Sequence, residues 1–134
     1  MQKELIISIV IIIAIIIINV VANNYTEKSV HYLDDKLDEI KQLSLEDNEN
    51  NTTQNKDKIQ EKIRKFREDW SKINASMAIY IEHDELEKVN TSLVILEQNL
   101  ILGEYVQGFA ELENCKYILN HIEDKESMRI INLF

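Results

Sequence analysis

Residues 59–80 have the sequence IQEKIRKFREDWSKINASMAIY. Apolar side chains return along this stretch at alternating intervals of four and three residues. They are Ile59, Ile63, Phe66, Trp70, Ile73, Met77 and Tyr80. This spacing places them along one side of an α-helix and leaves the charged residues on the other sides. The stretch therefore predicts a long amphipathic helix whose apolar stripe must be covered by other helices.

Two more apolar stripes follow toward the C-terminus and predict two further helices. Their positions are Leu86, Val89, Leu93, Leu96 and Leu100, and then Tyr105, Gly108, Leu112, Cys115, Leu119 and Ile122. Asp84 with Glu87 three residues later is typical of a helix N-cap, so we expect a turn or sharp kink over 82–84. Gly103 is a natural residue to end the first of these helices. Residues 124–126 interrupt the last stripe.

Upstream of residue 59, a polar stretch separates the amphipathic helix from an earlier one. Residues 47–56 contain no apolar residue, and we expect a flexible loop there. Before this loop, Val30, Leu33, Leu37 and Ile40 are spaced as one helical stripe, which predicts a juxtamembrane helix over 23–46.

Further upstream, residues 5–22 form an apolar run, LIISIVIIIAIIIINVVA. Eighteen helical residues span roughly 27 Å, close to the hydrocarbon thickness of a bilayer, so we expect a transmembrane signal-anchor. Residues 20–22 also fit a signal-peptidase site, but the run is longer than a usual cleaved signal. The short tail, residues 1–4, is typical of a cytoplasmic N-terminus. We therefore expect a single-pass protein of the cell membrane whose remaining chain lies outside the cytoplasm.

These patterns predict an all-α protein, with an N-terminal transmembrane helix followed by a small antiparallel helical bundle over 57–134. The absence of proline and the presence of only two glycines favour long helices. The predicted core residues are Ile63, Phe66, Trp70, Ile73, Leu93, Leu96, Leu112, Cys115 and Leu119.

Composition excludes several classes of function. The net charge is −9 and no basic stripe is present, which argues against nucleic-acid binding. A single cysteine rules out an intrachain disulfide.

Histidine and acidic residues lie together in three places, and each is more simply a solvated helix end than a metal or acid–base site. The three groups are Glu82-His83-Asp84-Glu85, then His31 with Asp34 and Asp35, and His121 with Glu123 and Asp124. Trp70 and Cys115 lie on apolar stripes, which favours packing over ligand stacking or nucleophilic chemistry. We therefore assign no catalytic, cofactor-binding or metal-binding residue, and we expect no cofactor.

The stretch Trp70…Ile81-Glu82-His83-Asp84-Glu85-Leu86…Ser92-Leu93…Leu96 resembles the bacterial family catalogued as domain of unknown function 4363. The order of parts is similar too, with an N-terminal apolar segment, a helix bearing a tryptophan, a helical hairpin and an apolar C-terminus. The resemblance implies a small membrane-anchored helical protein of Gram-positive-type bacteria, encoded beside multi-pass membrane proteins, and it implies no reaction.

Three interpretations of function remain. We prefer a non-enzymatic membrane-tethered module that binds another membrane protein through a short apolar tail. The residues of that tail are Met128, Ile130, Ile131 and Phe134. The first alternative is a self-associating coiled-coil scaffold, in which the stripes of 30–40 and 59–80 pair two copies of the chain. The second is an extracytoplasmic sensor of a small ligand or cation. Cleavage of the leader would instead make the chain a secreted helical protein.

Overall fold

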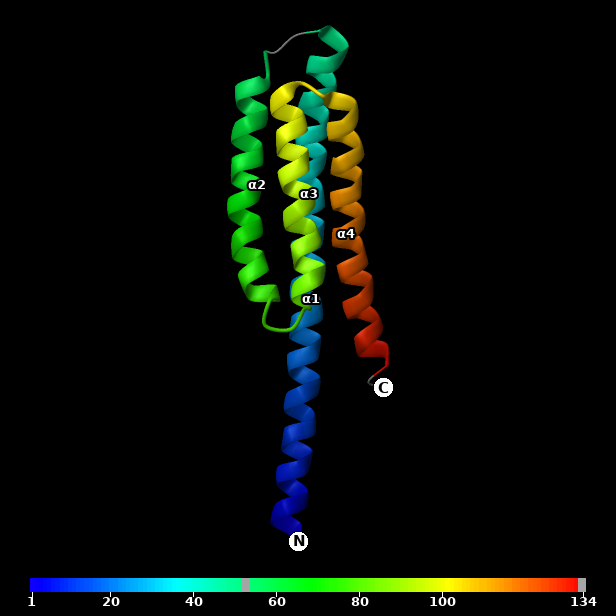
Figure 1. Cartoon of the computed structure of the whole chain (residues 1–134). Helices are drawn as coiled ribbons and strands as arrows, with labels where there is room; N and C mark the ends of the chain where they lie inside the picture. Colours follow the sequence, from blue (N-terminus) through cyan, green and yellow to red (C-terminus); the bar gives the residue numbers. More distant parts are fainter. Residues whose placement is uncertain (52–53, 133–134) are drawn as a thin grey trace.

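The computed structural model describes residues 1–51 and 54–132, and these form four α-helices (Figure 1). Helix α1 spans Gln2–Asn50, α2 spans Lys56–Met77, α3 spans His83–Leu102 and α4 spans Tyr105–Ile131. The prediction of an all-α helical bundle is confirmed.

Helix α1 has two halves with opposite surroundings. It runs for 49 residues without a break, so the apolar run and the expected juxtamembrane helix are one continuous helix. The apolar half projects alone from the bundle in Figure 1, and its window of highest hydropathy is fully outside the protein core. This helix is long and apolar enough to cross a membrane, as a signal sequence also is. No Gly or Pro separates the halves, so nothing in the sequence breaks the helix.

The second half of α1 packs with α2, α3 and α4 in an antiparallel arrangement, in which α1 and α3 each adjoin both α2 and α4. Four polar pairs fix the register of α1 against α4. They are His31–Glu123, Asp34–Asn120, Asp38–Lys116 and Lys41–Glu113. The two residue numbers of each pair add to 154, so the two helices stay in one register over about three turns.

The hydrophobic core draws on all four helices. Of the residues expected there, eight are buried, and Ile73 is partly buried and packs against the others. Helix α1 adds a full stripe, because Val30, Leu33, Leu37 and Ile40 are each at most 1% exposed. The bundle therefore begins within α1 and is larger than the segment 57–134.

Each of the two glycines has a structural role. Gly103 ends α3 with a left-handed backbone (φ 77°), a conformation that other residues adopt at a cost. Gly108 lets α4 approach α3 closely, because a Cβ atom there would lie 2.7 Å from Leu100 Cδ2.

Three boundaries differ from the sequence prediction. Helix α1 continues to Asn50, four residues into the expected loop, and the buried Asp47 carboxylate accepts a hydrogen bond from Asn55 N at 3.1 Å. Helix α3 begins at His83, with Glu82 as its N-cap in place of Asp84, and the turn before it covers residues 78–82. Helix α4 continues through 124–126 because Glu126 is buried and pairs with Arg129 at 2.9 Å.

Candidate functional site

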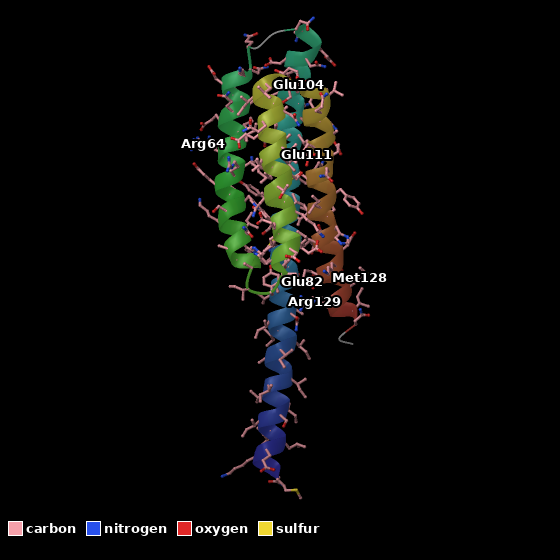
Figure 2. All side chains as sticks on the ribbon, viewed as in Figure 1. Arg64, Glu82, Glu104, Glu111, Met128 and Arg129 are labelled. Atoms are coloured by element: carbon pink, nitrogen blue, oxygen red, sulfur yellow. The ribbon has the colours of Figure 1, made fainter. Side chains whose placement is uncertain are left out.

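The end of the bundle nearest the apolar half of α1 brings together the features with functional potential. Figure 2 shows Glu82, Met128 and Arg129 at this end, whereas Glu104 lies at the opposite end. We call this end, formed by residues 22–31 of α1, the 78–82 turn and residues 122–131 of α4, the anchor-side end. Its residues come from three separate parts of the sequence, so only the fold assembles it.

A hydrogen-bond cluster fixes the 78–82 turn to α1. Tyr80 Oη lies 2.8 Å from Thr26 Oγ1 and donates to the Ala22 carbonyl at 3.4 Å. Thr26 is fully buried, and its hydroxyl also donates to the Ala22 carbonyl at 3.0 Å. Burial raises the pKa of the Tyr80 hydroxyl. The turn is therefore held at the residue where the apolar run ends.

The apolar residues at the end of α4 also belong to the anchor-side end. Met128 and Ile131 are 56% and 69% exposed, and Ile130 is partly buried. Phe134, the remaining residue of the proposed interaction surface, lies outside the described residues. The α1–α4 register places Ile131 level with Asn23, directly after the apolar run. The end of α4 thus reaches the level where the apolar run ends.

A polar pocket of about 310 Å³ lies between the turn and α4. Arg129 Nη1 donates to the Tyr80 carbonyl at 3.1 Å and to Glu126 at 2.9 Å, which connects α4 to the turn. Lys125 Nζ lies 3.4 Å from Glu82 and 3.6 Å from Glu85. These pairs offset most of the charge in the pocket, where Lys125 and Arg129 lie among three carboxylates.

Glu85 is one of two buried carboxylates in this pocket, at 9% exposed, and Glu126 is the other, at 8%. Lys88 Nζ donates to Glu85 Oε1 at 3.2 Å, and this hydrogen bond is the main reason that the pKa of the Glu85 carboxyl is lowered. Its other oxygen, Oε2, is buried without a hydrogen-bond partner. Such a group is costly to bury, so Glu85 is held by its cationic neighbours.

The Glu82–Glu85 segment does not gather into a ligand set. His83 and Asp84 are exposed, whereas Glu85 turns toward Lys88 and Lys125. His121 is also exposed, and its ring stacks on Tyr117 at a centroid distance of 6.4 Å. Neither the Glu82–Glu85 group nor the group around His121 brings its side chains together as metal ligands.

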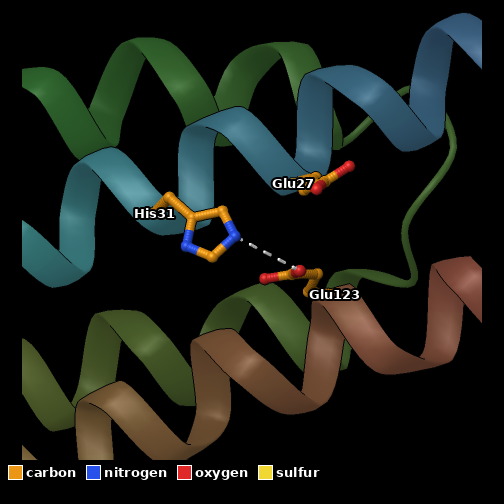
Figure 3. Close-up of side chains that lie close together, drawn as sticks. All are labelled: Glu27, His31 and Glu123. Carbon is orange, nitrogen blue, oxygen red and sulfur yellow. Dashed lines mark ion pairs between the residues drawn. The ribbon is translucent and has the colours of Figure 1, made fainter.

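A different combination does converge, on the surface between α1 and α4. Ligand atoms of Glu27, His31 and Glu123 all lie within 4.8 Å of one another, and Figure 3 shows Glu123 facing His31 across the helix pair. His31 Nε2 lies 3.8 Å from Glu123 Oε1. Partial burial, and to a smaller extent the carboxylates nearby, raise the pKa of Glu123.

The types of donor in this group suit a divalent transition metal. However, Glu27 is exposed and the His31 side chain is 67% exposed, so water reaches two of the three groups. The arrangement also serves as an ion pair once His31 is protonated. Sequence reasoning missed it because Glu27 and His31 adjoin Glu123 only through the α1–α4 register.

Cys115 lies in the middle of the core and is 0% exposed. Burial raises the pKa of its thiol to about 12, so the thiolate needed for nucleophilic chemistry does not form near neutral pH. Trp70 is also buried, and its indole N–H donates to Asn90 Oδ1 at 2.6 Å. Cys115 and Trp70 therefore both pack in the core, as the sequence predicts.

A protein-family model described as Domain of unknown function (DUF4363) matches residues 20–133. The match covers the whole bundle and most of the chain, and it begins near the end of the apolar run. The chain matches no curated protein and no solved structure.

Proposed function

We propose that this chain, which belongs to the DUF4363 family, is a single-pass membrane protein whose bundle binds another membrane protein and catalyses no reaction. The bundle would lie outside the cytoplasm, with residues 5–22 in the bilayer. The observation that carries the proposal is the position of exposed apolar residues at the level where the membrane span would end.

The continuity of α1 supports a role at the membrane surface. Because one helix contains both the apolar run and a stripe of the core, the bundle would be held directly at the bilayer without a linker. The Tyr80–Thr26 hydrogen bond adds a second attachment at the same point. A bundle held in this way would present a fixed surface to a neighbour in the same membrane.

The end of α4 supplies that surface. Met128 and Ile131 are apolar and exposed, whereas other apolar residues of α4, such as Leu119 and Ile122, are buried in the core. Exposed apolar groups clustered beside polar ones are typical of protein contacts. Arg129 follows Met128 in the sequence and is 52% exposed on its side chain, so the nitrogens other than the Nη1 that bonds Tyr80 and Glu126 offer a polar contact at the rim.

The coiled-coil alternative finds less support. Its two stripes, over 30–40 and 59–80, face the interior of a single chain, and Leu33, Leu37 and Phe66 are at most 2% exposed. Pairing two copies through these stripes would require the bundle to open. Self-association through the end of α4 would give recovery of the chain alone after crosslinking and affinity purification.

Affinity purification of the tagged full-length protein from its own membranes, after mild crosslinking, tests the proposal. We expect one membrane protein to co-purify with the wild-type chain and to be lost with the double variant Met128→Glu, Ile131→Glu. The matched control is Val106→Glu, because Val106 is 73% exposed on the same helix at the far end of the bundle. Recovery of the chain alone, or equal recovery of the partner with both variants, would contradict the proposal.

A further inference from the structure

An apolar groove lies on the other side of α1 from the end of α4, beneath the 78–82 turn. It has a volume of about 450 Å³. Its lining residues are Ile17, Ile18, Val21, Ala22, Tyr25, Ser76 and Tyr80. The groove is therefore formed where the end of α2 approaches α1, and four of its seven residues belong to the apolar run.

The lining indicates what fills the groove. Ile17, Ile18 and Val21 are exposed members of the apolar run, at 55%, 66% and 61%. These side chains form both the outer face of the apolar run and one wall of the groove. The medium that surrounds the apolar run therefore extends into the groove. For a membrane-spanning helix that medium is the hydrocarbon of the bilayer. The occupant that fits is thus the acyl chain of a lipid.

The turn above the groove has the composition of a segment that contacts a bilayer. Ile79 is 86% exposed, more than any other large apolar residue that the structure describes after the apolar run. The neighbouring Tyr80 directs its hydroxyl to Thr26 and the Ala22 carbonyl, at the end of that run. Tyrosines at this level are typical of the membrane–water interface, where an apolar ring and a polar hydroxyl are both satisfied.

We propose that the groove between the apolar run and the end of α2 holds a lipid acyl chain, and that Ile79 enters the membrane interface beside it. The bundle is then seated in the bilayer surface on its α2 side, leaving the end of α4 on the other side for a protein partner. This inference rests on the membrane anchoring in the proposed function, and it adds a lipid site that anchoring alone does not require.

Fluorescent labels on single cysteines test the lipid site in the full-length protein, reconstituted into phosphatidylcholine vesicles that contain a lipid with a quencher on its acyl chain. The test positions are Ile79→Cys, in the turn, and Ser76→Cys, in the groove. The control is Leu102→Cys, because Leu102 is 72% exposed at the far end of the bundle. The native Cys115 is fully buried, so it does not compete for the label.

We expect several-fold stronger quenching, and blue-shifted emission, at positions 76 and 79 than at position 102. Quenching at 76 and 79 that equals the value at 102 would overturn the inference. Blue-shifted emission at position 79 that is seen only in native membranes, without quenching in pure lipid, would indicate that the turn contacts a protein. This result would also overturn the inference. Extraction of the same protein with alkaline carbonate distinguishes failure of the lipid site from failure of the membrane anchoring. Release of the protein from the membrane would refute the anchoring itself.

Discussion

Replacing Leu37 with alanine tests whether the second half of α1 belongs to the core or stands as a stalk. Leu37 is 0% exposed and lies on the stripe of α1 that faces the other helices. The substitution removes three carbon atoms, which at ~0.8 kcal/mol each give about 2.4 kcal/mol from transfer alone. The cavity that remains brings the expected loss to about 2–5 kcal/mol, a large share of the ~5–15 kcal/mol that stabilises a typical domain.

The assay is urea unfolding of the full-length protein in mild detergent, followed by Trp70 fluorescence. Trp70 is the single tryptophan and is 3% exposed, so its emission reports the bundle and not the apolar half of α1. Leu119→Ala is the positive control because Leu119 is 0% exposed on α4, and we expect it to lose a similar amount. Val106→Ala, at a 73% exposed position, should lose less than about 0.5 kcal/mol. A Leu37→Ala protein as stable as the Val106→Ala protein would refute the packing of α1 in the core.

Three further predictions concern single side chains. Tyr80→Phe should lose about 0.5–1.5 kcal/mol in the same assay because the hydroxyl contacts Thr26, whereas Tyr117→Phe, at a 70% exposed position, should match wild type. A hydrogen bond from Lys62 and, to a smaller extent, one from Lys36 lower the pKa of Glu39 from 4.5 to about 2. The ionised Glu39 carboxylate therefore stabilises the folded state fully above the ordinary carboxyl pKa, and this stabilisation is lost as the pH falls toward 2. Glu39→Gln should therefore cost below ~1 kcal/mol at neutral pH, since the side chain is 42% exposed, and nothing at the acid end of a pH series of unfolding curves. Cys115, with a pKa of about 12, should take up a maleimide only after denaturation, and stoichiometric labelling of the native protein by intact mass would contradict its burial.

Spacing in the sequence was sufficient to predict the helices and their buried faces. Each stripe repeats at helical intervals, and burial of a stripe needs only a neighbouring apolar surface. Gly103 also marks the end of α3, because few other residues adopt its left-handed backbone without strain.

Boundaries set by polar residues were harder to predict. Asp47 appears in the sequence as part of a polar loop, yet its carboxylate accepts a hydrogen bond from Asn55 N at the start of the next helix. Glu126 appears as an interruption of an apolar stripe, yet pairing with Arg129 allows it to be buried. In both cases the decisive partner is a polar group whose position depends on the fold.

The anchor-side end needed the three-dimensional register. Nothing in the sequence pairs Glu123 with Glu27 and His31, or places Ile131 level with Asn23, until the α1–α4 register is known. The groove is a similar case, because Ser76 and Ile17 meet only after the end of α2 folds back onto α1. The apolar run itself was evident from the sequence, and what surrounds its exit from the bundle was not.

Photocrosslinking from position 131 tests directly whether the end of α4 binds a membrane protein. A photoreactive residue replaces Ile131 in the full-length chain, and a second protein carries it at Val106. We expect an adduct with one membrane protein from position 131, formed in the native membrane and missing from position 106. Adducts of the chain with itself alone, or the same adduct from both positions, would contradict it.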